Sequence, residues 1–228
     1  MNIEKIYNQK TSVYKESLNF YIAKYIELNK KILDVGCASG KLGAYLKKEK
    51  NAIVVGVDIS KIAIDQATKV LDETYCLNIE KDNLPFVKNS FDIIICVDIL
   101  EHLFNPRKTL KKLKHYLKND GYFVLSIPNI ANIEIRLNLL LGKFNYQRTG
   151  ILDNTHIKFF TQKTAKGLVQ SAGLKILKID YTPGFSFFFL RHKYIKNSPF
   201  LQKIKYFLCK IWPTLLCCQF IIIAKKND

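Results

Sequence analysis

Short apolar runs alternate along this chain with longer segments in which apolar residues recur at helical spacing. Such alternation of strands and helices builds a largely parallel sheet with helices on both faces. The pattern therefore predicts a doubly wound α/β fold. The expected strands are residues 31–35, 53–57, 91–97, 122–126, 174–179 and 220–224, and the expected helices are residues 11–29, 42–48, 61–70, 106–117 and 164–171.

Other segments interrupt this alternation. Asn119, Asp120 and Gly121 tolerate the conformations of a sharp reversal, so we expect a turn between a helix and the next strand there. Residues 130–146 are apolar and periodic and predict an inserted helix, and residues 150–161 predict a polar loop. Together these two segments are expected to form a small lid.

The strand at residues 31–35 leads directly into a glycine-rich turn, GCASG, which a helix follows. Gly36 and Gly40 lack a Cβ atom, so the backbone can turn tightly and approach a ligand closely. Asp34 can orient this turn or meet an amino group of the ligand. Asp58 ends the next strand with a carboxylate that can accept hydrogen bonds from both ribose hydroxyls. Together these features predict a nucleotide site.

The dinucleotide fingerprint requires small residues at positions 36, 38 and 41. Gly36 and Ala38 satisfy it, whereas Lys41 would obstruct the approach of a pyrophosphate and the packing of the helix. An NAD-binding oxidoreductase is therefore the alternative at this site rather than the favoured hypothesis.

Five segments make the chain similar to the class I S-adenosylmethionine-dependent methyltransferases. The resemblance spans about residues 31–182 and is strongest to the branch of ubiquinone-biosynthesis O-methyltransferases and polysaccharide-cluster methyltransferases. It implies a Rossmann-like, mostly parallel sheet of seven strands. The matching segments are ILDVGCASGKLG, GVDIS, NLPFVKNSFDIIICVDILEHL, LKNDGYFVLSIPN and LDNTHIKFFT.

The resemblance also implies roles for individual residues. The turn that includes Cys37 and Ala38 would face the methionine moiety of S-adenosylmethionine, Asp58 would hold the ribose, and Ile59 would flank the adenine. Asn78, where the family usually has Asp, would meet the adenine edge. The full set expected at the cofactor is Asp34, Gly36, Cys37, Ala38, Gly40, Asp58, Ile59, Asn78, Ile79 and Val97.

Four polar side chains are candidates for the chemistry. Asp98, Glu101 and His102 follow the strand at residues 91–97, where ligands bind in open α/β sheets, and His156 belongs to the lid. In one hypothesis His102 or His156 is a general base for a hydroxyl group. In the other, all four bind a divalent metal, Mg²⁺ or Mn²⁺, that lowers the pKa of the hydroxyl.

Related enzymes do not decide between these hypotheses. The metal hypothesis resembles the E-x-x-E-H motif of the metal-dependent small-RNA 2′-O-methyltransferases, in which Asp98 would replace the first Glu. A structural role for Glu101, capping a helix or bonding the cofactor loop, is the third possibility. We expect that His156→Ala abolishes turnover and leaves the affinity for the cofactor nearly intact.

The net charge bears on the partners of the protein, and the cysteine content bears on its cellular location. The chain has 36 Lys+Arg against 19 Asp+Glu, a formal charge of +17, which favours anionic partners. The lysines are spread along the chain and no RNA-binding module is evident, so a nucleic-acid-binding protein is an alternative that we do not favour. The six cysteines form no CxxC pair and the N-terminal residues lack the apolar run of a signal peptide, which predicts a cytoplasmic protein.

The segment 183–213 is dense in aromatic and basic residues. We favour packing of these aromatic side chains on the sheet edge. Peripheral contact of the segment with a membrane is the alternative. The apolar stretch 206–224 is interrupted by Lys210, Pro213 and Gln219, so it predicts a short buried helix and a final strand rather than a transmembrane segment.

We therefore expect one methyltransferase domain over residues 1–228. Its parts are a helical cover (1–30), a cofactor-binding core (31–129), a lid (130–162), and closing elements that include the basic aromatic insertion (163–228). By resemblance, the expected reaction is O-methylation of a small acceptor such as a nucleotide-activated or lipid-linked sugar. Metal-assisted methylation of a catechol or quinone precursor, or of an RNA-terminal diol, is the alternative.

Overall fold

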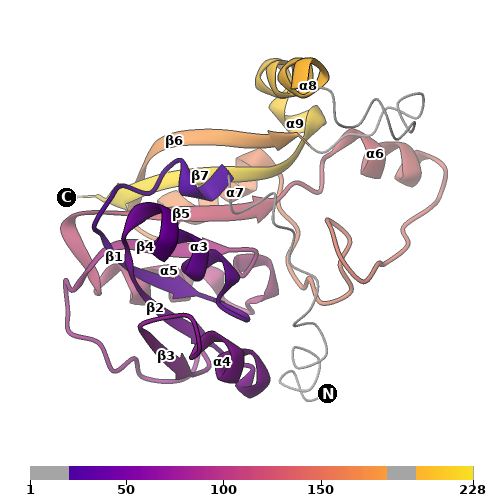
Figure 1. The fold of residues 1–228 in the computed structure, drawn as a ribbon. Helices are drawn as coiled ribbons and strands as arrows, with labels where there is room; N and C mark the ends of the chain where they lie inside the picture. The colour runs from indigo at the N-terminus through magenta and orange to yellow at the C-terminus, as the bar shows by residue number, and fades with distance from the viewer. Residues whose placement is uncertain (1–20, 184–198, 228) are drawn as a thin grey trace.

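A single mixed sheet of seven strands organises the chain, as a computed structural model that describes residues 21–183 and 199–227 shows (Figure 1). The strand order is β3-β2-β1-β4-β5-β7-β6, with β7 antiparallel to both of its neighbours. The predicted Rossmann-like α/β fold is confirmed. The strands are β1 (Lys31–Val35), β2 (Ile53–Asp58), β3 (Glu73–Cys76), β4 (Phe91–Val97), β5 (Leu117–Pro128), β6 (Leu174–Pro183) and β7 (Cys217–Lys226).

Helices cover both faces of the sheet because successive strand residues point to opposite faces. In β1, Leu33 and Val35 belong to one core cluster and Ile32 to the other. Helices α3 (Lys41–Lys50) and α4 (Lys61–Ala67) pack on the Ile32 face, and α5 (Pro106–Lys114) and α7 (Gln162–Ser171) on the Leu33 face. The remaining elements are η1 (Leu100–His102), α6 (Ile133–Leu140), α8 (Pro199–Ile211) and α9 (Pro213–Leu216).

The position of β1 in the sheet determines where a ligand can bind. It pairs in parallel with β2 on one side and β4 on the other, so the chain order of the strands reverses between β1 and β4. Ligands of open α/β sheets bind beyond the carboxyl ends of the strands at such a point. The loops that follow β1 and β4 both begin there, which brings Gly36 and Asp98 to the same edge.

The structure corrects several sequence-based boundaries. The strand β3 was not predicted, because its four residues form a half-exposed edge with no apolar run. The expected turn at Asn119–Gly121 is wrong: these residues lie inside β5, where the register against β4 shifts between Phe91 and Ile93 and forms a bulge. Gly121 is required there because an added Cβ atom would lie 2.7 Å from the carbonyl oxygen of Asp92.

The helices near the two ends of the chain also differ from expectation. Of the helix expected at residues 11–29, residues 11–20 lie outside the described part, and the remainder is helical only to residue 23. The lid helix α6 covers eight residues instead of the expected 130–146. In α8, the expected burial holds for Cys209 but not for Phe207, whose exposed fraction is 62%. Among the helices that the structure describes, none is long and apolar enough to cross a membrane.

Candidate active site

The turn after β1 has the backbone geometry of a ligand cradle. Gly36, Ala38 and Gly40 have φ angles of 76°, 47° and 78°, in the left-handed region that favours glycine. A Cβ atom at Gly36 would lie 3.1 Å from the side chain of Ile99, and one at Gly40 would lie 3.1 Å from Cα of Ala67. The two glycines therefore permit both the turn and its close approach to the neighbouring loops.

Asp58, at the end of β2, holds this turn in place. Its Oδ2 atom accepts a hydrogen bond of 2.9 Å from the backbone N–H of Ala38, and its Oδ1 atom accepts one of 2.8 Å from that of Ser60. Each carboxylate oxygen can accept a second hydrogen bond, so Asp58 can still bind a pair of hydroxyl groups. The structure thus joins two predicted cofactor residues, Ala38 and Asp58, by a direct contact.

Asp34 is buried next to this turn. Its Oδ2 atom has no hydrogen-bond partner among the described residues. Burial, and then the neighbouring charge of Asp58, raise the pKa of Asp34 to about 7. A buried carboxylate that lacks donors is stabilised by a ligand cation. The ammonium group of a methionine moiety fits this requirement.

The other predicted cofactor residues occupy the same end of the sheet. Cys37 is buried, and burial raises the pKa of its thiol, which keeps it neutral. Val97 ends β4, and Ile59 and Ile79 follow β2 and β3, which run in parallel. The Oδ1 atom of Asn78 accepts backbone N–H groups from Glu80 and Lys81, so its oxygen is already used within its own turn.

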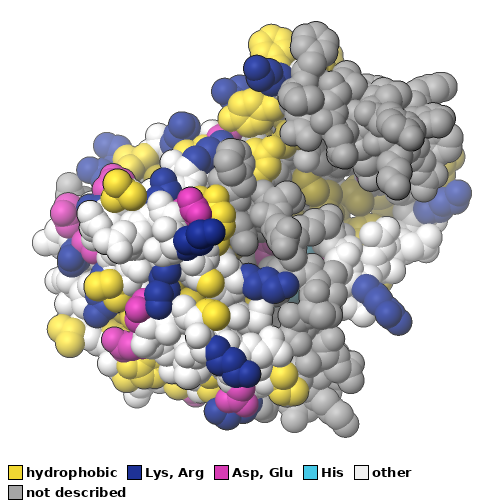
Figure 2. Space-filling model, in the orientation of Figure 1, with side chains coloured by type: hydrophobic (Ala, Val, Ile, Leu, Met, Phe, Trp, Pro, Cys, Tyr) yellow, Lys and Arg dark blue, Asp and Glu magenta, His cyan; other side chains and the backbone are white. Residues whose placement is uncertain are grey.

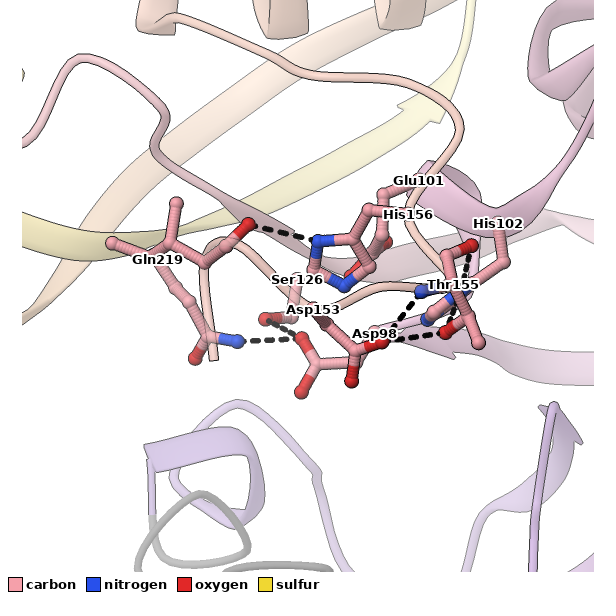
Figure 3. A network of polar contacts seen from close by, with 9 residues as sticks. Asp98, Glu101, His102, Ser126, Asp153, Thr155, His156 and Gln219 are labelled. Atoms are coloured by element: carbon pink, nitrogen blue, oxygen red, sulfur yellow. Dashed lines mark hydrogen bonds and ion pairs between the residues drawn. The ribbon is translucent and has the colours of Figure 1, made fainter. Parts of the chain in front are cut away.

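A second loop, after β4, contains three of the four candidate residues, Asp98, Glu101 and His102, and the lid contributes the fourth, His156 (Figure 3). Asp98 has a φ angle of 52°, and the short helix η1 follows it. The backbone oxygen of Glu101 accepts hydrogen bonds of 3.0 Å from the N–H groups of both Ile157 and Lys158. These contacts dock the lid on η1 and bring His156 beside Glu101 and His102.

The two histidines are oriented in the same way. The Nδ1 atom of His102 lies 3.0 Å from the backbone oxygen of Thr155, and Nδ1 of His156 lies 2.9 Å from that of Ile151. Because a carbonyl oxygen only accepts, each Nδ1 carries a proton, so in the neutral form of each ring Nε2 would be the atom that can act as a base or a ligand. The rings meet edge to face, with centroids 4.7 Å apart.

Glu101 is the most deeply buried member of this group. Its exposed fraction is 1%, and neither carboxylate oxygen has a hydrogen-bond partner among the described residues. Burial, followed by the charges of Asp98 and Asp153, raises the pKa of Glu101 well above its usual value. Its Oε1 atom lies 3.7 Å from Nε2 of His156. A proton or a cation between these atoms would relieve the burial of the carboxylate charge.

Three of the four predicted metal-ligating residues form one cluster. Single ligand atoms of Glu101, His102 and His156 all lie within 4.8 Å of one another. Asp98 belongs to a neighbouring network instead: its Oδ1 atom accepts hydrogen bonds from Gln219 (2.5 Å) and Ser126 (3.3 Å). The prediction of Asp98 as a ligand gains no support from this arrangement.

Several residues of the site were not predicted from the sequence. Asp153 accepts hydrogen bonds from both the N–H and the hydroxyl of Thr155, and so shapes the loop whose carbonyl group orients His102. The Asp-x-Thr spacing of a side-chain-capped turn was the available signal. For Gln219, the signal was a polar residue within an apolar strand.

Three aromatic side chains of the lid form a row of ring contacts that ends at His156. The ring of exposed Tyr146 contacts that of Phe144, with centroids 5.5 Å apart, and Phe144 contacts Phe159 at 6.1 Å. Phe159 in turn meets the ring of His156 at 6.4 Å. The lid can therefore contact an apolar part of a substrate whose polar group reaches His156.

Residues 7–179 match the protein family described as a methyltransferase domain. The chain is 31% identical, over 70% of each sequence, to a ubiquinone biosynthesis O-methyltransferase of Coxiella burnetii, and 27% identical to that of Neisseria meningitidis, over 76% of this chain and 75% of the other. Its fold is similar to an S-adenosylmethionine-dependent methyltransferase of Archaeoglobus fulgidus, with a TM-score of 0.65, 19% identity, and coverage of 99% of this chain and all of the other. The chain therefore belongs to the class I S-adenosylmethionine-dependent methyltransferases.

Proposed function

We propose that the protein methylates a hydroxyl oxygen of a small acceptor that binds against Glu101, His102 and His156. The observation that supports this most directly is the three-residue cluster at the carboxyl end of β4, next to the cofactor turn that follows β1. Methyl transfer is an in-line displacement, so the acceptor oxygen must lie close to the sulfonium. The lid would exclude water from that space.

The proton of the hydroxyl needs a base as the methyl group moves. In the general-base form, Nε2 of His156 or His102 takes this proton while the acceptor oxygen bonds to the methyl carbon and the carbon–sulfur bond breaks. The products are the methyl ether, S-adenosylhomocysteine and a protonated histidine. Glu101, 3.7 Å from His156, would stabilise the resulting imidazolium.

The same residues also fit a divalent metal ion. Ligating histidines characteristically donate their second ring N–H to a backbone carbonyl group, as His102 and His156 do here, and the buried Glu101 carboxylate lacks hydrogen-bond donors. Two imidazoles and one carboxylate suit Mn²⁺ or another transition metal better than Mg²⁺. When bound, such an ion would lower the pKa of the acceptor hydroxyl and position it.

For the acceptor we propose a sugar hydroxyl, and the lipid-linked class over the nucleotide-activated class. The aromatic path from Tyr146 through Phe144 and Phe159 to His156 suits a molecule with an apolar part. The positive charge of the chain suits its phosphates. None of the six cysteines, all of which the structure describes, forms a disulfide bond, which agrees with the cytoplasmic location that we propose.

A catechol is the second candidate acceptor. The similar proteins of C. burnetii and N. meningitidis are named ubiquinone biosynthesis O-methyltransferases, and a vicinal pair of oxygens would match a metal held by Glu101, His102 and His156. Aromatic rings of the lid would also contact such a substrate.

Parallel assays with lipid-linked sugars, nucleotide sugars and catechols test this proposal, with S-adenosylhomocysteine release and product mass as readouts. We expect methylation of the lipid-linked sugars, and loss of it in His156→Ala. Transfer to catechol alone would reverse the order of the two acceptors. Transfer to nitrogen or carbon in every productive case would contradict O-methylation.

A further inference from the structure

The helix α8 has apolar side chains on two opposite faces. Cys209 is fully buried in the core, and Leu208 packs against it. On the other side, Ile204, Phe207 and Ile211 are spaced three and four residues apart, so they share one face, and all three are exposed. A helix on a protein surface normally places polar residues on its outer side. Within the part of the chain that the structure describes, the outer face of α8 is therefore an exposed apolar surface suited to a partner.

Basic residues flank this exposed face. Lys203 and Lys210 are exposed, and the sequence contains no acidic residue between Asp180 and Asp228. Figure 2 shows basic and hydrophobic side chains together where α8 lies. A second copy of this chain, with its charge of +17, would meet this face with like charges. The complementary partner is anionic.

Polar contacts hold α8 in this orientation. The hydroxyl of Tyr206 donates to Asp180 on β6, with distances of 2.8 and 3.0 Å to its two carboxylate oxygens. The Nζ atom of Lys210 lies 4.7 Å from the centre of the Tyr206 ring. The contact between Tyr206 and Asp180 joins α8 to β6, so it opposes a rotation that would turn the apolar outer face of the helix into the core.

Two further exposed apolar groups lie at the same end of the molecule (Figure 1). Trp212, directly after α8, is 63% exposed. Leu140, the last residue of α6, and Leu141 after it are exposed. The side-chain amide of Asn132 at the start of α6 donates to the backbone oxygen of Cys217, just after α9. The beginning of α6 is thus tied to the segment that follows α8.

We propose that this surface docks on an anionic phospholipid bilayer. The α8 face, defined as Ile204, Phe207, Ile211 and Trp212 with Lys203 and Lys210, lies in the plane of the interface. Its apolar side chains enter the boundary between headgroups and acyl chains, while the lysine ammonium groups contact lipid phosphates. Tryptophan is enriched at this depth of a membrane. The inference does not depend on the identity of the methyl acceptor.

Flotation of the full chain with two kinds of vesicle tests the proposal: phosphatidylcholine alone, and phosphatidylcholine mixed with phosphatidylglycerol. We expect strong binding only to the anionic vesicles. Replacing Lys203 and Lys210 by Gln should weaken it roughly thirty-fold. The double variant Phe207→Ser, Ile211→Ser should weaken it at least about tenfold.

Matched controls separate the α8 face from the general basicity of the chain. Lys108→Gln with Lys111→Gln on α5 removes the same charge, and Leu28→Ser with Val87→Ser removes exposed apolar surface elsewhere. Both controls should bind within about twofold of the parent chain. Three results would each overturn the proposal. They are an equal loss of binding in the variants and the controls, no binding of the parent chain to anionic vesicles, and a dimer that dissociates on Phe207→Ser, Ile211→Ser.

Discussion

Glu101 and Asp180 are both buried carboxylates, with exposed fractions of 1% and 4%, but their surroundings are opposite. Asp180 accepts hydrogen bonds from Lys24, Tyr25, Tyr206 and its neighbouring backbone N–H. Neither carboxylate oxygen of Glu101 has such a partner among the described residues. Among the described residues, the Asp180 carboxylate thus accepts several hydrogen bonds and the Glu101 carboxylate accepts none.

The two pKa values differ accordingly. Burial alone would raise the pKa of Asp180, but the hydrogen bonds from Lys24, Tyr25 and Tyr206 lower it to about 2. For Glu101, burial and the nearby charge of Asp98 both raise the pKa. A satisfied carboxylate of this kind stabilises the fold, whereas one without donors is characteristic of a functional site. This difference distinguishes the Asp180 contacts that anchor α8 from the catalytic site that we propose at Glu101.

His156→Ala should have the largest effect, because it removes the ring whose Nε2 atom lies 3.7 Å from the Glu101 carboxylate. We expect turnover to fall about a thousandfold, whether His156 is a base or a metal ligand, and cofactor affinity to stay within about twofold. Initial rates and calorimetric titration with S-adenosylhomocysteine measure the two quantities. The exposed His115→Ala is the matched control and should change neither. Unchanged turnover in His156→Ala would contradict both mechanisms.

Much of the fold could be predicted from the sequence, because buried parallel strands are continuous apolar runs. Residues 31–35 and 91–97 match β1 and β4 in the structure. The edge strand β3 escaped prediction because its residues are half exposed and mixed in character. The bulge at Asn119–Gly121 was mistaken for a turn because the same residue types favour both.

The residues predicted from local motifs lie at the ends of two strands. Asp34 is near the end of β1, directly before the glycine-rich turn, and Glu101 is in the loop after β4. His156 was predicted as a residue of the lid. Gln219 reaches Asp98 from a strand more than a hundred residues later, and no local pattern indicates that pairing. The Asp180 network joins residues near positions 24 and 206 by the same kind of distant contact, so its role emerged only from the structure.

Asp180→Asn should produce the next largest effect, a loss of about 2 kcal/mol in the free energy of unfolding at pH 7. Because the folded-state pKa is lowered, the stabilisation is present above about pH 4 and disappears as the pH falls through about 2. Urea unfolding of both proteins across this range measures it, and the curves should converge in acid. Asp65→Asn, which removes an exposed ion pair with Lys61, should cost less than about 0.5 kcal/mol. A loss in Asp180→Asn that is independent of pH would contradict the charged state.

Glu101→Gln should have the smallest effect, and the opposite sign. A raised folded-state pKa means that stability is complete below the unfolded pKa of about 4.3 and is lost as the pH rises through the folded value. The neutral amide avoids this loss, so at pH 8 the variant should be about 1 kcal/mol more stable than the parent chain, with no difference near pH 4. Saturating Mn²⁺ should make the chelator-treated parent chain more stable than Glu101→Gln. A cation that binds the Glu101 carboxylate stabilises the folded parent, whereas the neutral amide of the variant binds it less well. Melting curves with and without Mn²⁺ measure both differences. If Glu101→Gln is less stable than the parent at pH 8 without metal, Glu101 acts as Asp180 does, as a satisfied structural carboxylate. If Mn²⁺ leaves the variant the more stable protein, the result favours histidine as the general base.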